Sequence, residues 1–255
     1  MIRKILLGGV IALTLILGAG WGWLQWYASA SQDAAFFEDE IRAFELADQE
    51  NPPPDDTVIF VGSSSIRLWD TLDRDMAPLV VRNRGFGGSQ LAHLNVFARR
   101  ILSPHRPQAV VVYAGDNDLD ARTGKTAEVV LADFQELVGI LREDTPETRV
   151  YYLSIKPSKQ RWSRWPEISR ANADIRAHCA EDPRLTFVDL STVLLGEDGE
   201  PRDDVFIVDG LHLSPTGYAE WTRVLRPLLL GDLLPDETAA SGTLPSGGND
   251  ATRDL

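Results

Sequence analysis

Five short apolar runs, separated by stretches of helical periodicity, limit what this chain can fold into more than any other feature of its sequence. Runs of four to six residues fit buried strands and are too short for helices. Between them, apolar residues such as Leu91, Leu94 and Ala98 recur at the spacing of one helix face. Strands that alternate with amphipathic helices form a parallel sheet with helices on both faces. The sequence therefore predicts an α/β fold, a three-layer α/β/α sandwich with a five-stranded parallel sheet in flavodoxin-like order, its strands at residues 58–61, 79–82, 109–114, 150–155 and 185–190.

The first of these runs, residues 58–61, meets Gly62 and then three consecutive serines. Glycine permits a sharp turn, and a serine just beyond it lies at the edge where α/β sheets place ligands. Ser64 is therefore a candidate nucleophile. Taken alone, the stretch is better explained by serines that cap the next helix, so other parts of the chain must decide.

Charge and composition argue against nucleic-acid binding, a disulfide and a metal site. The formal net charge is −13, whereas nucleic-acid binding needs a clustered basic surface. Cys179 is the only cysteine, which excludes an intramolecular disulfide and a thiolate metal site, and we expect it in the core. The four histidines show no metal-ligand spacing, so we predict no metal and no other cofactor. The oligomeric state stays open.

The first 30 residues read as a transmembrane anchor or a signal peptide. Arg3 and Lys4 precede the apolar residues 5–24, a stretch long enough to span a bilayer. Since positive residues stay cytoplasmic, everything that follows would be extracytoplasmic and anchored to the membrane. Secretion or a periplasmic location after cleavage near Ala30 is the alternative. We expect one folded domain at residues 31–234 and a disordered tail at residues 235–255, which has little to bury.

A histidine near the end of the chain supplies a candidate base. His212 follows Asp209 by three residues, so the carboxylate can accept a hydrogen bond from Nδ1 and leave Nε2 free. Ser214 and Pro215 suit the start of a helix that would anchor this loop. A surface histidine that caps a helix explains this segment equally well.

Two more loops follow predicted strands and carry hydrogen-bond donors. Asn117, in residues 115–118, offers a side-chain amide, and Gly88, in residues 85–88, offers an unobstructed backbone N–H. Either group can donate to an oxyanion. Both residues are also common in simple turns.

The four blocks together, residues 62–65, 85–88, 115–118 and 209–212, resemble the SGNH (GDSL-like) hydrolase superfamily over roughly residues 41–230. This resemblance implies the SGNH hydrolase fold, with Ser64 as nucleophile, His212 as general base and Asp209 as its orienting carboxylate. It also implies an oxyanion hole formed by Ser64, Gly88 and Asn117.

One position departs from the family pattern. Many members carry Asp directly before the nucleophile, where this chain has Ser63. We expect this difference to affect substrate preference and not competence. Ser63 and Ser65 stay open as alternative nucleophiles, and Gly62, two residues upstream, favours Ser64.

The resemblance implies a serine esterase, lipase or acylhydrolase that cleaves O-acyl esters. Acetylated carbohydrate, short-chain ester and lysophospholipid are all candidate substrates, and the sequence does not rank them. An O-acyltransferase of the same fold is one alternative. A non-catalytic module that binds envelope carbohydrate or lipid is another.

Residues 156–167 are unusually rich in tryptophan, arginine and lysine. Trp162 and Trp165 are candidate substrate-binding residues, because this loop should lie at the same edge of the sheet as Ser64. Packing of these side chains as a rim on the domain itself is an equally good interpretation. Asp116, Asp118 and Asp120 have calcium-loop spacing but lack the glycine and glutamate that such a loop needs, which argues against calcium.

Overall fold

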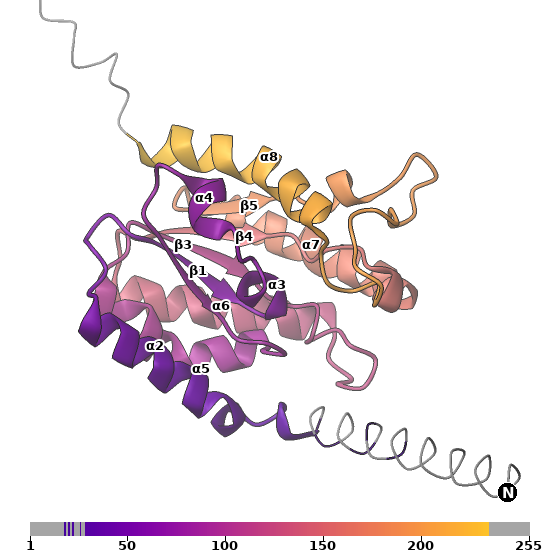
Figure 1. The fold of residues 1–255 in the computed structure, drawn as a ribbon, viewed down its shortest axis with the longest axis horizontal. Coiled ribbons are helices and arrows are strands. Elements are labelled where there is room, and N and C mark those ends of the chain that lie inside the picture. Colours follow the sequence, from indigo (N-terminus) through magenta and orange to yellow (C-terminus); the bar gives the residue numbers. More distant parts are fainter. Residues whose placement is uncertain (1–17, 19, 21, 23–25, 27–28, 235–255) are drawn as a thin grey trace, which may run out of the picture.

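The computed structural model describes residues 18, 20, 22, 26 and 29–234. In this part of the chain, a five-stranded parallel sheet has the order β2-β1-β3-β4-β5 (Figure 1). This confirms the predicted sheet and its flavodoxin-like order. The strands are β1 (Val58–Gly62), β2 (Val81–Gly85), β3 (Ala109–Tyr113), β4 (Arg149–Leu153) and β5 (Leu185–Val188).

Helices cover both faces of the sheet and complete the three layers (Figure 1). Successive residues of β1 point to opposite faces: Ile59 and Val61 pack in one core, Val58 and Phe60 in the other. The first core contains α2 (Glu38–Glu50), α5 (Leu91–Ile101), α6 (Ala127–Asp144) and α7 (Trp165–Cys179), and the second contains α3 (Ser64–Arg67), α4 (Leu72–Met76) and α8 (Pro215–Leu233).

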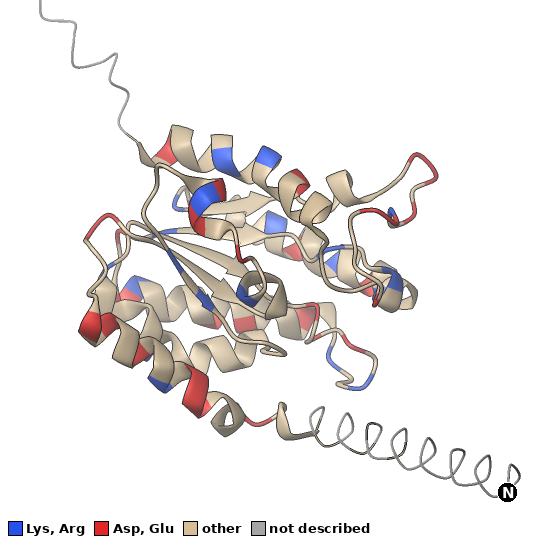
Figure 2. Cartoon of the chain, in the orientation of Figure 1, with Lys and Arg blue, Asp and Glu red and all other residues tan. Residues whose placement is uncertain are grey.

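Two inner strands, β1 and β3, explain why apolar runs in the sequence predicted the sheet. Every residue of β1 and β3 is buried, and neither strand carries a charge (Figure 2). A strand covered on both faces needs an unbroken apolar run, which is what residues 58–61 and 109–114 provide. Cys179 packs in the first core, as predicted.

Strand β2 differs from the prediction. It begins at Val81 and runs to Gly85, whereas the sequence pattern placed it at residues 79–82. β2 is an edge strand that pairs only with β1, so half-buried polar residues such as Arg82 and Asn83 are tolerated in it. Apolar residues alone therefore predict a strand that begins and ends too early in the sequence.

The segment expected as a loop at residues 156–167 is largely helical. A 3₁₀ segment, η3 (Lys159–Arg164), leads directly into α7 at Trp165. Pro166 lies in the first turn of α7, where its missing N–H costs nothing. The loop proper is thus limited to the few residues after β4.

The ends of the chain fall largely outside the described residues. No helix in the described part is both long and apolar enough to cross a bilayer. The predicted span at residues 5–24 lies outside that part except for positions 18, 20 and 22, and the predicted tail at residues 235–255 lies wholly outside it.

Candidate active site

Ser64 lies at a sharp turn between β1 and α3, at the carboxyl end of the sheet. Gly62 makes this turn possible: its φ is 145°, and a Cβ there would lie 1.9 Å from the carbonyl oxygen of Tyr113 on the neighbouring strand. No side chain fits so close an approach. Ser64 is the first residue of α3, so its backbone N–H has no acceptor within that helix.

The three consecutive serines have different surroundings. Ser63 and Ser65 are fully buried, and only Ser64 is partly accessible. Ser63 Oγ donates to the Asp116 carboxylate at 3.4 Å, while Ser65 Oγ accepts from Lys156 Nζ at 3.0 Å. The flanking hydroxyls are therefore engaged inside the protein, which leaves Ser64 facing the solvent side.

His212 lies on a loop that is closed at both ends. Phe206 and Leu213 form an antiparallel bridge across the loop, and Ile207 N donates to His212 O at 2.9 Å. Ser214 caps α8 by accepting from Gly217 N at 3.2 Å, which fixes the exit of the loop. The predicted helix start at Ser214 is confirmed.

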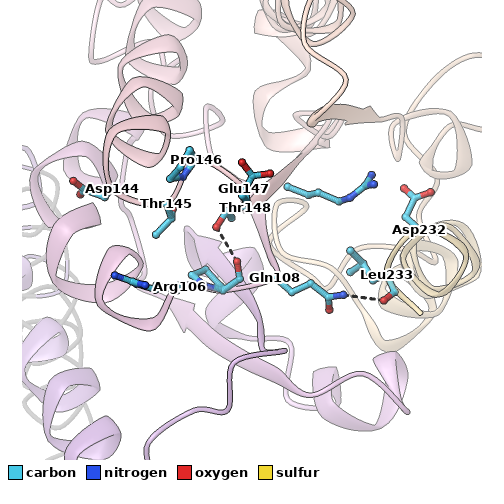
Figure 3. A pocket seen from close by; sticks show the side chains of 11 residues that line it. Arg106, Gln108, Asp144, Thr145, Pro146, Glu147, Thr148, Asp232 and Leu233 are labelled. Carbon is cyan, nitrogen blue, oxygen red and sulfur yellow. Dashed lines mark hydrogen bonds between the residues drawn. The ribbon is translucent and has the colours of Figure 1, made fainter. Parts of the chain in front are cut away.

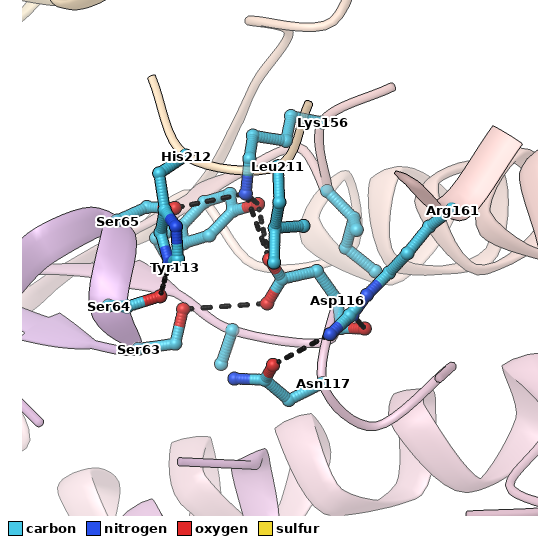
Figure 4. Close-up of polar contacts among 12 residues, drawn as sticks. Ser63, Ser64, Ser65, Tyr113, Asp116, Asn117, Lys156, Arg161, Leu211 and His212 are labelled. Carbon is cyan, nitrogen blue, oxygen red and sulfur yellow. Dashed lines mark hydrogen bonds and ion pairs between the residues drawn. The ribbon is translucent and has the colours of Figure 1, made fainter. Parts of the chain in front are cut away.

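The structure brings Ser64, His212 and Asp209 together. His212 Nε2 lies 2.9 Å from Ser64 Oγ (Figure 4). His212 Nδ1 lies 2.6 Å from an Asp209 carboxylate oxygen. The other Asp209 oxygen accepts from Leu211 N at 2.9 Å and from His212 N at 3.0 Å. Partial burial raises the pKa of Asp209, but the hydrogen bonds from His212 and Leu211 outweigh it and lower that pKa. The carboxylate thus stays ionised beside the ring.

Gly88 and Asn117 lie next to one another at the same end of the sheet. Gly88 has a φ of 89°, and Asn117 Nδ2 donates to the carbonyl oxygen of Ser89, the residue that follows. The turn that holds Gly88 packs on the nucleophile turn, because Phe86 N donates to Gly62 O at 2.9 Å. In Figure 4 the Asn117 amide nitrogen lies on the side of the serines. The donors suggested by sequence are therefore neighbours.

Comparison with known proteins agrees with this geometry. The model of the GDSL-like Lipase/Acylhydrolase family matches residues 58–220. The chain belongs to this family. It is also 33% identical over 198 residues to platelet-activating factor acetylhydrolase IB subunit alpha1 of Pongo abelii, covering 75% of this chain and 82% of the relative. This GDSL-like chain is accordingly a hydrolase of ester bonds.

Solved structures show the same fold at low identity. A GDSL-like lipase from Bacteroides thetaiotaomicron has a TM-score of 0.64 at 17% identity, covering 76% of this chain and 98% of the lipase. A family 3 carbohydrate esterase from Clostridium thermocellum has a TM-score of 0.55 at 19% identity, covering 73% of this chain and 98% of the esterase. These structures confirm the predicted fold class, and the family match over residues 58–220 confirms the predicted superfamily.

Trp162 and Trp165 of this hydrolase stack on each other, with ring centroids 5.6 Å apart. Both side chains are half-buried, and Trp165 packs against the core that contains α5, α6 and α7. Packing of Trp165 on the domain is therefore observed. A contact of either ring with substrate stays a prediction.

Three charged residues beneath the site were not assigned a role from the sequence. Lys156 and Asp116 form an ion pair at 2.9 Å, with side chains 1% and 4% exposed. Arg161 donates to the carbonyl oxygen of Asp116 at 2.8 Å and to Asn117 Oδ1 at 3.1 Å. A sequence signal existed for Asp116 alone, since Ser63 replaces an acidic residue and Asp116 lies directly before Asn117.

The aspartates with calcium-loop spacing are each engaged by cations of the protein. Asp116 pairs with Lys156, Asp118 with Lys125 at 3.2 Å, and Asp120 with Arg122 at 2.8 Å. Their carboxylates point to separate partners. The arrangement serves internal ion pairs.

A cavity of about 560 Å³ lies at the opposite end of the sheet (Figure 3). Gln108 and Thr148, which line it, directly precede β3 and β4, so the cavity faces the amino ends of the strands. Ser64 follows the carboxyl end of β1. This cavity is therefore separate from the candidate active site.

Proposed function

We propose that this hydrolase cleaves O-acyl esters with Ser64 as nucleophile, His212 as general base and Asp209 as the carboxylate that orients His212. The observation that carries the proposal is the continuous chain of short contacts, 2.9 Å from Ser64 Oγ to His212 Nε2 and 2.6 Å from His212 Nδ1 to Asp209. A serine hydroxyl is a weak nucleophile until an adjacent base accepts its proton, and this contact supplies that base.

In the first half of the reaction, Ser64 Oγ attacks the ester carbonyl carbon while its proton passes to His212 Nε2. Nδ1–H donates to Asp209, which fixes the tautomer and stabilises the imidazolium. The tetrahedral intermediate then collapses, and the leaving alcohol takes the proton from Nε2. The product of this half is an acyl ester on Ser64.

In the second half, water attacks the acyl carbonyl carbon and gives a proton to His212 Nε2. Collapse of the second intermediate releases the carboxylic acid, and the proton returns to Ser64 Oγ. Both intermediates carry an oxyanion. We propose that the Ser64 and Gly88 backbone N–H groups and Asn117 Nδ2 donate to it, and losing one such donor typically costs about 10²–10³ in rate.

For the substrate we propose a short-chain, acetyl-like ester. The support comes from the relatives, since the subunit that is 33% identical is named an acetylhydrolase. A series of p-nitrophenyl esters with acyl chains of increasing length tests this proposal, and the highest kcat/KM is expected for acetate.

The mechanism is tested by Ser64→Ala, which is expected to lower kcat by roughly 10⁴–10⁶. Ser103→Ala is a matched control, because Ser103 begins the short 3₁₀ helix η2 (Ser103–His105) after α5 and its Oγ donates to the exposed Asp144. It should keep the wild-type kcat. Unchanged ester hydrolysis by purified Ser64→Ala protein would rule the mechanism out.

From the residue pattern alone we also propose that residues 1–30 attach the enzyme to a membrane, with the domain on the extracytoplasmic side. The test is extraction of membranes with alkaline carbonate, followed by sequencing of the mature amino terminus. Release into the soluble fraction with a start after Ala30 would favour the cleaved form.

A further inference from the structure

Residues 156–161 connect three loops of the proposed active site. The sequence pattern left open whether this segment contacts substrate or packs on the domain, and in the structure Lys156 is 1% exposed and Arg161 is 7% exposed. Burying charges is costly unless they are paired and hydrogen-bonded. The contacts of these two side chains therefore show which groups of the site the buried charges hold in place.

Lys156 has three hydrogen-bond acceptors, one for each proton of an ammonium group. They are Ser65 Oγ at 3.0 Å, Tyr113 Oη at 2.9 Å and the Asp116 carboxylate at 2.9 Å (Figure 4). Ser65 directly follows the nucleophile and Asp116 directly precedes Asn117. One buried cation thus joins the nucleophile turn to the loop that carries the amide donor.

The Asp116 carboxylate also bonds to the residue on the other side of the nucleophile. Its second oxygen accepts from Ser63 Oγ at 3.4 Å, and Ser63 directly precedes the nucleophile. Both neighbours of Ser64 are therefore tied to the Lys156–Asp116 pair. The carboxylate that many family members carry at the position of Ser63 is supplied here from a different loop.

Arg161 acts on the amide itself. Its guanidinium donates to Asn117 Oδ1 at 3.1 Å, which holds the amide oxygen away from the position where an oxyanion would form. An amide that turned over would present its oxygen there and repel the negative charge. Because Arg161 also donates to Asp116 O at 2.8 Å, the backbone and the side chain of this loop are fixed together.

The same segment reaches the loop of the base. Gln160 N donates to Gly210 O at 3.1 Å, and Gly210 lies between Asp209 and His212. Residues 156–161 are thus hydrogen-bonded to the nucleophile turn, the amide loop and the base loop. Their described hydrogen bonds do not include the Ser64 hydroxyl or the His212 ring.

We propose that residues 156–161 form a positioning clamp, in which Arg161 fixes the orientation of the Asn117 amide and Lys156 fixes its loop against the nucleophile turn. This inference rests on the proposed function, since it assigns a task to groups that support Ser64 and Asn117. Arg161 and Lys156 are positioning residues, and they act on the transition state through Asn117.

Arg161→Met tests the clamp. We expect kcat to fall roughly 10–100-fold while KM for a p-nitrophenyl acetate substrate stays within about threefold, because a misplaced donor affects the transition state more than substrate binding. Arg170→Met is the matched control: Arg170 is an exposed arginine of α7 whose partner is the exposed Glu128. It should keep the wild-type kcat and KM.

A double-mutant cycle separates positioning from a general structural role. In an Asn117→Ala background, Arg161→Met is expected to change kcat by less than about twofold, because the group it positions is gone. The same 10–100-fold loss in both backgrounds would overturn the proposal, and so would a wild-type kcat for Arg161→Met.

Arg161→Lys carries the test if the methionine variant does not fold. Lysine keeps the charge but lacks the fork that bonds Asp116 O and Asn117 Oδ1 together, so kcat should fall here too, again only when Asn117 is present. Ser64→Ala distinguishes the two proposals. An active Ser64→Ala protein overturns the function, whereas an inactive one beside a fully active Arg161→Lys overturns only the clamp.

Discussion

Two acid–base pairs lie at the candidate active site in opposite surroundings. Asp209 and His212 are three residues apart on one surface loop, with side chains 35% and 25% exposed. Asp116 and Lys156 are 40 residues apart and almost completely buried. The first pair contacts Ser64 Oγ through His212, and the second bonds to Ser63 and Ser65, the residues on either side of Ser64.

The difference follows from what each pair must do. In the proposed mechanism His212 gains and loses a proton twice in each cycle, and a change of charge is easier where water and a flexible loop can respond. A pair that only positions other groups gains from burial, because a low dielectric strengthens fixed contacts. We therefore expect the exposed pair to control catalysis and the buried pair to control stability as well as alignment.

The largest expected effect is on catalysis at the exposed pair. Asp209→Asn should lower kcat by about 10³–10⁴, because the amide no longer holds the His212 tautomer with Nε2 free to accept a proton. Its free energy of unfolding should change by less than about 1 kcal/mol, as for other exposed pairs. Steady-state kinetics and urea unfolding measure both quantities.

Asp203→Asn is the control for this change, since Asp203 is a 91% exposed carboxylate whose partner is the exposed Lys159. It should leave kcat unaltered. If Asp209→Asn instead unfolded the protein while keeping its kcat, the contrast between the two pairs would be wrong.

The buried pair should give the next largest effect, this time on stability. Lys156→Met leaves Asp116 as a buried charge without its main partner, and such changes cost about 3–5 kcal/mol of unfolding free energy. Combining it with Asp116→Asn should restore at least half of that loss. Urea unfolding of the single and double variants measures it, and equal loss in both would contradict a role for the charge pair.

Two buried aspartates near the site allow a test by pH. Burial raises the pKa of Asp116, but Lys156 and Arg161 outweigh burial and lower it to about 2. Its stabilisation is present above the unfolded pKa, near 3.9, and is lost as the pH falls through 2. Asp118 shows the reverse, since burial dominates over Lys125 and raises its pKa to about 6.

For Asp118 the folded state holds its proton more tightly than the unfolded state, so stability falls as the pH rises from 4 through 6. A shift of this size corresponds to about 2–3 kcal/mol. Relative to wild type, Asp118→Asn should therefore gain about that much stability between pH 4 and pH 7.5. Urea unfolding at both pH values measures the gain.

The smallest effect on catalysis is expected at the tryptophan pair. Trp165→Ala should cost about 1–2 kcal/mol of stability, because its ring packs against the core. With p-nitrophenyl acetate, kcat/KM should stay within about threefold for this variant and for Trp162→Ala. A larger change for Trp162→Ala alone would identify its ring as part of the substrate pocket.

The sequence was most informative where burial demands one type of residue. The apolar runs of β1 and β3 and the helical spacing in α5 predicted those elements because both faces of the sheet are covered. The same reasoning failed at β2, where an exposed edge admits polar residues. Hydrophobic patterns thus report burial, and they predict strands only where the strand is buried.

The residues of the candidate site also fall into those that the sequence singled out and those that it did not. Ser64 and His212 were found because short local motifs surround them, and these motifs follow from a turn and a helix cap. Lys156 and Arg161 were given no role because the sequence does not record that Asp116, about 40 residues away, lies opposite them. Partners brought together only by the sheet order have no local signal.

The lone cysteine has a practical consequence. Cys179 lies in the core at 4% exposure, and burial raises the pKa of its thiol to about 12, so almost none of it is thiolate at neutral pH. A maleimide reagent should therefore leave the wild-type protein unlabelled. A single cysteine introduced in η3, for example at the exposed Ser163, could then carry a fluorophore that reports movements of this segment without labelling of the natural thiol.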